Sequence, residues 1–118
     1  QEAKKEEYQE LAIQYLKRSI EVAYPRERAL YINQQLAELY YDKGKLGNAG
    51  HAFAQCIEYD DSDNPLNYYN AAQMYMADGD DLKARLYLRI FLQKAPKMKE
   101  GAEKEKLITK AKTQLKTR

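Results

Sequence analysis

Few residues in this chain of 118 have side chains that support catalysis. It contains one histidine, His51, and one cysteine, Cys56. A nucleophile needs a base within reach, and a phosphate-binding loop needs a glycine-rich turn at the start of a helix. The chain offers neither arrangement, and it has no paired carboxylates on an apolar background. We therefore expect that the protein is not an enzyme and holds no metal or cofactor, with His51 in solvent and Cys56 in the core.

Two acidic stretches are the remaining candidates for ion binding: DDSDN at residues 60–64 and DGDD at residues 78–81. A calcium-binding loop needs alternating oxygen ligands, a central glycine and a distal glutamate. Pro65 interrupts the first stretch, whereas Lys83 and Arg85 follow the second. Helix capping by the acidic side chains explains both stretches better than calcium binding.

The composition indicates one folded domain in which opposite charges lie in different parts of the chain. Hydrophobic residues make up 44% and charged residues 32%, as in folded proteins. The formal net charge is +2, yet residues 58–81 carry seven acidic and no basic residues, and residues 94–118 carry nine basic and three acidic residues. A chain of this length corresponds to a single domain, residues 1–118.

The sequence leaves the cellular compartment open. A single cysteine excludes an internal disulfide framework, and no run of about 18 apolar residues predicts a membrane span. The chain begins with Gln1 rather than Met, so we expect that its start was removed. The compartment is therefore unknown: a soluble protein is expected, in the cytoplasm or, if a signal peptide was removed, in the periplasm or outside the cell.

Apolar spacing of three and four residues predicts an all-α domain of about six helices and no strand. Proline or glycine ends most of the segments, because proline cannot donate an interior hydrogen bond and glycine adopts the left-handed turn that closes a helix. Asn64 followed by Pro65 is a strong helix start. In the first helix the expected inward face includes Tyr8, Leu11, Ala12, Tyr15 and Leu16. The helices are expected at residues 2–24, 27–41, 46–59, 65–77, 82–94 and 99–116.

Two stretches of the chain match each other at a constant offset of 35 residues. The offset pairs small, aromatic and glycine residues: Ala37 with Ala72, Tyr40 with Tyr75, Gly44 with Gly79 and Ala49 with Ala84. The pattern resembles the tetratricopeptide repeat (TPR), a helix–turn–helix of about 34 residues that reads W-x2-L-G-x2-Y, then A-x3-F, then P. Its positions are filled by Asn33, Leu36, Ala37, Tyr40, Ala49 and Phe53 in the first unit, and by Tyr68, Ala71, Ala72, Tyr75, Ala84, Leu88 and Pro96 in the second.

The resemblance implies a right-handed α-α superhelix of TPR-like hairpins. Residues 30–63 form the first repeat and residues 65–96 the second. Residues 1–25 form an N-terminal helix, which we interpret as half of an earlier, degenerate repeat. Residues 99–118 form a capping helix that covers the last repeat with Leu107, Ile108, Ala111 and Leu115. The chain departs from the repeat pattern at Asn33, where an aromatic residue is usual, and at Asp61, where a proline is usual.

By the same resemblance, the first helices of the two units line a concave groove that binds a peptide or a partner's helix. The implied function is a non-enzymatic protein-protein interaction module or adaptor. Gln34, Glu38 and Gln73 stand where a subgroup of the family uses cations and asparagines to clamp a carboxylate, so we do not expect that ligand. The implied groove residues are Tyr31, Gln34, Glu38, Tyr41 and Asp42 from the first unit, and Leu66, Tyr69, Asn70, Gln73 and Met76 from the second.

Other functions stay open at this stage. The groove side chains could merely solvate the groove, and the chain could be a structural subunit docked permanently in a larger complex. Homo-oligomers are also possible. The basic C-terminal helix could meet an anionic surface, although we do not expect nucleic acid as a partner because lysines around an amphipathic helix usually form a solvated face. The lysines concerned are Lys104, Lys106, Lys110, Lys112 and Lys116.

Overall fold

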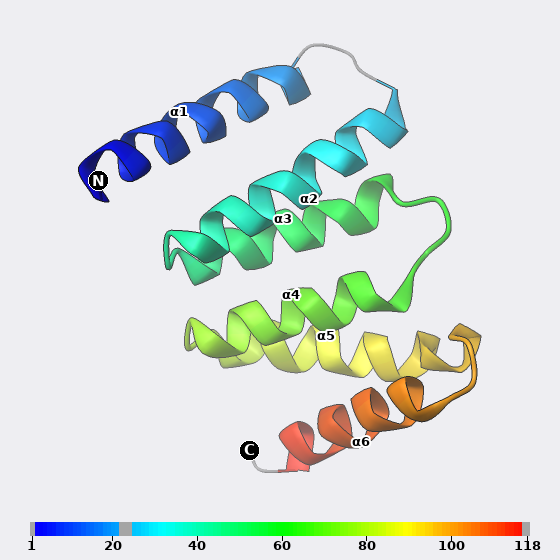
Figure 1. Cartoon of the computed structure of the whole chain (residues 1–118). Coiled ribbons are helices and arrows are strands. Elements are labelled where there is room, and N and C mark those ends of the chain that lie inside the picture. Colours follow the sequence, from blue (N-terminus) through cyan, green and yellow to red (C-terminus); the bar gives the residue numbers. More distant parts are fainter. Residues whose placement is uncertain (1, 22–24, 117–118) are drawn as a thin grey trace.

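A computed structural model describes residues 2–21 and 25–116, and within these residues the chain is helical without a strand (Figure 1). The prediction of an all-α domain of about six helices is therefore confirmed. The last three residues of the predicted first helix, 22–24, lie outside the described residues. The elements are α1 (Glu2–Glu21), α2 (Arg26–Asp42), α3 (Leu46–Tyr59), α4 (Pro65–Ala77), α5 (Asp81–Lys94), the short 3-10 helix η1 (Ala95–Lys97) and α6 (Ala102–Lys116).

The helices form a stack in which successive members run in alternating directions (Figure 1). α2 and α3 make one hairpin and α4 and α5 make the next, and α3 packs against both α2 and α4. α1 lies at one end of the stack and α6 at the other, so the two termini are at opposite ends. The domain measures 41 × 32 × 25 Å along its principal axes.

Glycine makes the tight turn inside each hairpin. Gly44 has a φ of 76° and Gly79 a φ of 84°, which L-residues with side chains rarely adopt. Each residue donates its N–H to a carbonyl of the preceding helix, at 3.0 Å in both cases. The connection between the hairpins uses the predicted cap instead, because Asn64 accepts the N–H of Leu66 at 3.0 Å and Pro65 occupies the first turn.

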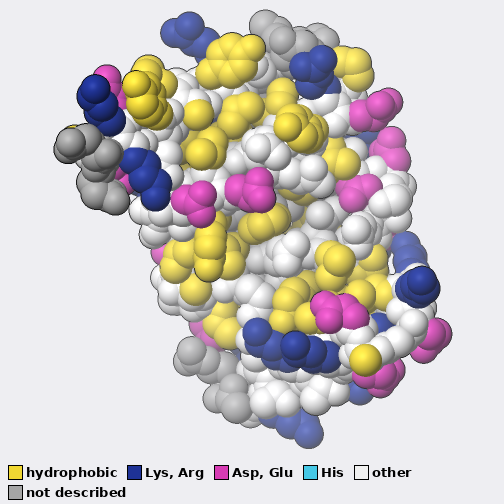
Figure 2. Space-filling model, in the orientation of Figure 1, with side chains coloured by type: hydrophobic (Ala, Val, Ile, Leu, Met, Phe, Trp, Pro, Cys, Tyr) yellow, Lys and Arg dark blue, Asp and Glu magenta, His cyan; other side chains and the backbone are white. Residues whose placement is uncertain are grey.

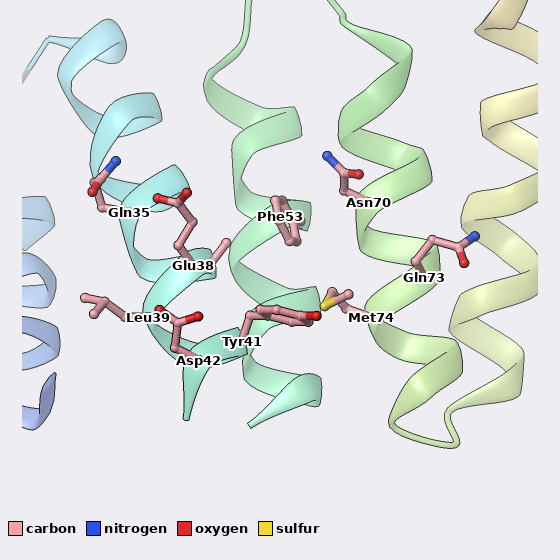
Figure 3. Close-up of a pocket in the computed structure, with 10 residues that line it drawn as sticks. Gln35, Glu38, Leu39, Tyr41, Asp42, Phe53, Asn70, Gln73 and Met74 are labelled. Carbon is pink, nitrogen blue, oxygen red and sulfur yellow. The ribbon is translucent and has the colours of Figure 1, made fainter. Parts of the chain in front are cut away.

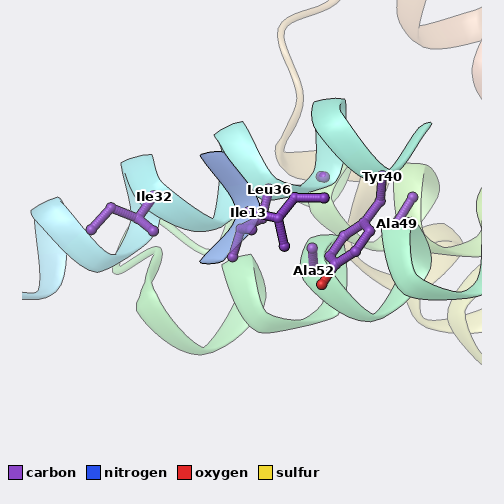
Figure 4. Close-up of a cluster of buried hydrophobic side chains, with 7 residues drawn as sticks. Ile13, Ile32, Leu36, Tyr40, Ala49 and Ala52 are labelled. Carbon is purple, nitrogen blue, oxygen red and sulfur yellow. The ribbon is translucent and has the colours of Figure 1, made fainter. Parts of the chain in front are cut away.

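Small residues bring the helices of each hairpin close together. Ala37 and Ala49 are fully buried between α2 and α3, and Ala72 and Ala84 are fully buried between α4 and α5. Larger side chains fill the space on either side. Figure 4 shows the first core cluster, with Ile13, Ile32, Leu36, Ala37, Tyr40, Ala49 and Ala52. The second joins α4, α5 and α6 through Tyr68, Tyr69, Ala72, Leu88, Phe91, Ala95 and Ala111.

The first helix buries only part of the predicted face, because Ala12 and Leu16 are half-buried but the larger side chains point outward. Ile13 is buried in the core, whereas Tyr8, Leu11 and Tyr15 are 66%, 59% and 71% exposed. The reason is that α1 packs mainly against one neighbouring helix, α2, and turns Ile13 and the half-buried Leu16 toward the first core cluster. Tyr8, Leu11 and Tyr15 therefore form an apolar stripe on the outer side of α1.

The sixth helix packs as predicted through its apolar stripe, except for one lysine. Ala111 is fully buried, and Leu107, Ile108 and Leu115 pack around it on the second core cluster. Lys104 is buried too, so it cannot belong to a basic surface. Its ammonium group donates to the carbonyl oxygens of Pro96 at 3.3 Å and Met98 at 3.4 Å and pairs with the carboxylate of Glu100. These bonds hold the connection between α5 and α6, which contains η1 and delays the start of α6 to Ala102.

Asp63 makes a second polar junction, between the two halves of the stack. Its carboxylate accepts hydrogen bonds from Lys94 at 2.6 Å and Lys97 at 2.8 Å and from the hydroxyl of Tyr68 at 3.2 Å. The two lysines hold the pKa of this carboxyl at about 2, below its usual value of 3.8. The backbone of Asp63 has a φ of 53°, which aspartate and asparagine tolerate better than most residues. The loop between α3 and α4 is thereby fixed to the end of α5.

Candidate functional site

An open groove of about 690 Å³ runs between α2, α3 and α4. Its volume lies within the range of protein pockets that hold ligands, roughly 300 to 1,000 Å³. The groove belongs to both hairpins, because α2 and α3 come from the first and α4 comes from the second. The residues that line it are Gln35, Ala37, Glu38, Leu39, Tyr41, Asp42, Phe53, Asn70, Gln73 and Met74.

The groove has an apolar part and a polar part. Phe53 of α3 lies in the middle, and Tyr41 points from α2 toward Met74 on α4 (Figure 3). Glu38 and Asn70 come from the two helices on opposite sides (Figure 3). A ligand in the groove would meet an aromatic ring and a thioether between hydrogen-bonding groups, a combination that suits a peptide.

Helical spacing places the polar groups of the groove. Glu38, Tyr41 and Asp42 are three and four residues apart, so they share one face of α2. Leu36 and Tyr40 lie on another face of the helix, which is buried in the core. On α4, Asn70 and Gln73 are three residues apart in the same way. Their neighbours in α4 are buried against α5: Tyr68, Ala71, Ala72 and Tyr75.

The groove is negatively charged. Glu38 and Asp42 are the only charged residues that line it, both are exposed, and neither forms an ion pair or hydrogen bond with another described residue. Neither α2 nor α4 has a basic residue in its last turn, at the negative end of its helix dipole. In Figure 2, carboxylates and apolar side chains lie together over the α2 to α4 part of this face, and a row of basic side chains lies nearer to α5 and α6.

The structure brings five of the ten sequence-predicted groove residues together in the groove: Glu38, Tyr41, Asp42, Asn70 and Gln73. The others lie elsewhere. Tyr31 borders a shallow hollow beside Pro25, Glu27 and Arg28, and Gln34 is exposed outside the groove. Leu66 borders a separate hollow next to the connection between α5 and α6.

Two further predicted site residues pack inside the molecule. Tyr69 is buried against Phe91, with 5.1 Å between the ring centroids, and the ammonium group of Lys110 lies 6.0 Å from its ring. Met76 packs against the second core cluster. Phe91 of α5 and Lys110 of α6 both cover this side of α4. The amide groups of Gln73 and Gln114 also exchange hydrogen bonds of 2.9 and 3.0 Å between α4 and α6.

Sequence reasoning missed several residues of the groove. Phe53 fills a repeat position of the first unit, but it is only half-buried and forms part of the groove. Gln35, Leu39 and Met74 were not assigned at all. The sequence signal for Phe53 is its place on α3 between two helices of different hairpins, where a core residue can keep one edge of its ring accessible.

The remaining reactive side chains lie apart from the groove. His51 is exposed, as predicted, with its Nε2 atom 3.3 Å from the Nε2 atom of Gln55. Cys56 is fully buried, as predicted, and burial raises the pKa of its thiol to about 11, so the reactive thiolate is scarce at neutral pH. Within residues 2–21 and 25–116, no group of three or more His, Cys, Asp and Glu side chains is placed to hold a metal ion.

Comparisons with known proteins add no relationship to this description. No protein-family model matches the chain, and neither the curated proteins nor the solved structures contain a significant match. Among the described helices, none combines the length and the apolar character that crossing a membrane requires.

Proposed function

We propose that the chain is a TPR-like protein-binding module that holds a segment of a partner protein in the groove between α2, α3 and α4. The observation that carries this proposal is the groove itself. It is open to solvent, it spans two hairpins, and it combines the ring of Phe53 with polar groups on α2 and α4. A segment with both apolar and polar side chains could bury the first kind on Phe53 and Met74 and pair the second kind with Asn70 and Glu38.

Equivalent positions of the two hairpins support the TPR-like assignment. Residues 35 positions apart have the same environment: Gly44 and Gly79 have similar positive φ angles, and Ala37 and Ala72 are both fully buried. The second helices agree, since Ala49 and Ala84 are fully buried as well. Two units of the same sequence pattern thus fold into two hairpins of the same design, as in repeat proteins.

The test is affinity capture from native extract with the wild-type chain and with the Tyr41→Ala/Asn70→Ala variant, followed by mass spectrometry. Both residues line the groove and neither hydrogen-bonds another described side chain, so the variant should fold normally. Tyr69 is a poor choice for this purpose because it is buried against Phe91. We expect specific proteins to be retained by the wild type and lost by the variant. Equal retention by both chains would contradict the proposal.

A second candidate function is permanent docking in a larger complex through the outer side of α1. The exposed stripe of Tyr8, Leu11 and Tyr15 favours it, because contiguous apolar side chains on a surface often mark an interface. The triple variant Tyr8→Gln/Leu11→Gln/Tyr15→Gln separates this candidate from groove binding. Loss of captured proteins with this variant, and not with the groove variant, would favour docking through α1.

A further inference from the structure

The groove is lined by negative charge, whereas the whole protein carries a small net positive charge. The chain has a formal net charge of +2, but both charged residues that line the groove are acidic. Glu38 and Asp42 lie four residues apart on α2, so their carboxylates project from successive turns of one helix face. A charged group in the groove meets two carboxylates there and no groove-lining lysine or arginine.

Several observations indicate that these two carboxylates are available to a ligand. Both side chains are exposed, and they make no ion pair or hydrogen bond with any other residue in the described part of the chain. The lysine that follows Asp42 is already engaged: the ammonium group of Lys43 lies 2.8 Å from Glu6 and 3.4 Å from Glu10, and its side chain is buried. Asp42 also closes the last turn of α2, which is at the negative end of the helix dipole and contains no basic residue.

The apolar part of the groove lies beside this negative edge. Phe53, Met74 and the ring of Tyr41 line it. Lysine and arginine suit such a place well, because their methylene stems pack on apolar surface while the charged head reaches a carboxylate. The amide of Asn70 stands on α4 across from Glu38, and an amide of this kind can hydrogen-bond the backbone of an extended segment, whereas the amide of Gln73 is already bonded to Gln114.

We propose that the groove selects a partner segment that carries a lysine or arginine next to an apolar side chain, with the cation at Glu38 and Asp42 and the apolar side chain on Phe53 and Met74. This proposal rests on the proposed function, since it names the chemistry of the segment that the groove would bind. The argument is charge complementarity: an acidic segment would place like charges at the α2 edge, and a neutral one would leave both carboxylates without a partner.

The experiment is a selection of unstructured twelve-residue peptides from a random library on the immobilised chain. The selected sequences are then made as fluorescent peptides in three forms, with the lysine or arginine kept, replaced by norleucine, or replaced by glutamate. Dissociation constants are measured by fluorescence polarisation at low and moderate salt. Three variants are compared with the wild type: Glu38→Gln/Asp42→Asn, Tyr41→Ala/Asn70→Ala, and the control Glu7→Gln/Glu58→Gln, which removes two exposed charges outside the groove.

We expect lysine and arginine to be enriched in the selected peptides. Norleucine should weaken binding about two- to fivefold, the size typical of exposed charge pairs, and added salt should reduce the difference. Glutamate should weaken binding further. Glu38→Gln/Asp42→Asn should bind the lysine and norleucine forms equally, and the control variant should behave like the wild type.

The outcomes separate this proposal from the one on which it rests. If the peptides lose binding with Tyr41→Ala/Asn70→Ala but contain no excess of lysine or arginine, or bind Glu38→Gln/Asp42→Asn as tightly as the wild type, the groove binds peptides and the cation preference is wrong. If the peptides bind all variants equally, or if none is selected, both the groove function and the cation preference are wrong.

Discussion

Two glycines in α3 should respond in opposite directions to the same substitution, Gly→Ala. Both lie in helical conformation, where alanine is more favourable than glycine by up to about 1 kcal/mol. The surroundings differ. A Cβ atom at Gly50 would lie 3.0 to 3.2 Å from three ring atoms of Tyr75, whereas a Cβ atom at Gly47 would lie 2.7 Å from a carboxylate oxygen of Asp78.

The ring of Tyr75 cannot move away easily. It is buried between α3 and α5, and it stacks on Tyr87 with 5.8 Å between centroids and 11° between ring planes. Forcing a methyl group into such a contact costs about 1 to 3 kcal/mol. This cost exceeds the stabilisation of up to about 1 kcal/mol that alanine gives over glycine in a helix. We expect Gly50→Ala to lower the free energy of unfolding by about 1 to 2 kcal/mol. The Asp78 side chain is exposed and can rotate, so Gly47→Ala should leave stability unchanged or raise it by about 0.5 kcal/mol.

Urea denaturation followed by circular dichroism at 222 nm measures both changes on the same scale. Gly47→Ala is the matched control, because it makes the same chemical change in the same helix. A Gly50→Ala variant as stable as Gly47→Ala would refute the reasoning, since it would show that the Tyr75 ring is not held against α3.

Three further substitutions test the packing and the polar junctions. Asp63→Asn keeps the positive φ but removes a carboxylate whose pKa is depressed to about 2. That carboxylate stabilises the fold above pH 4 and loses its effect as the pH falls toward 2, so the urea midpoint of the wild type should drop in this range and that of the variant should drop less. Phe91→Ala empties a fully buried site and should cost about 3 to 5 kcal/mol in urea unfolding. Lys104→Met removes the ammonium group that binds the α5–α6 connection; hydrogen exchange should increase at residues 95–101, and it should not increase with the exposed control Lys106→Met.

Much of the fold follows from local signals in the sequence. The ends of the helices are fixed by short-range chemistry, such as the cap of Asn64 and the left-handed turns at Gly44 and Gly79, and these signals need no knowledge of the neighbouring helices. The 35-residue offset also predicts which helices pair, because it identifies the small residues at which the helices of each hairpin cross. The start of α6 was less predictable, since it depends on bonds from Lys104 to carbonyl groups six and eight residues earlier.

The candidate site was predictable only in part, because it depends on what covers each helix. The resemblance to the repeat family placed Glu38 and Tyr41 of α2 in the groove, where the structure has them, but it also placed Tyr31 and Gln34 there, which lie elsewhere. On α4 the same resemblance also selected Tyr69, which α6 and Phe91 bury. Helical spacing identifies a face of α4, but only the path of α6 decides which part of this face stays open.

In the first helix, spacing again identifies apolar faces without showing which one is covered, because this helix has two apolar stripes. Tyr8, Leu11 and Tyr15 form the larger one, and by hydrophobic area alone it should be buried. The face with Ile13 and Leu16 packs on the first core cluster instead, and polar contacts accompany it. Glu6 and Glu10 bind Lys43 at the end of α2, and Lys17 lies 6.0 Å from the ring of Tyr40. Glu6, Glu10 and Lys17 share a face of α1 with Ile13. Packing that face on α2 pairs their charges with Lys43 and the ring of Tyr40, and it turns Tyr8, Leu11 and Tyr15 to the outside.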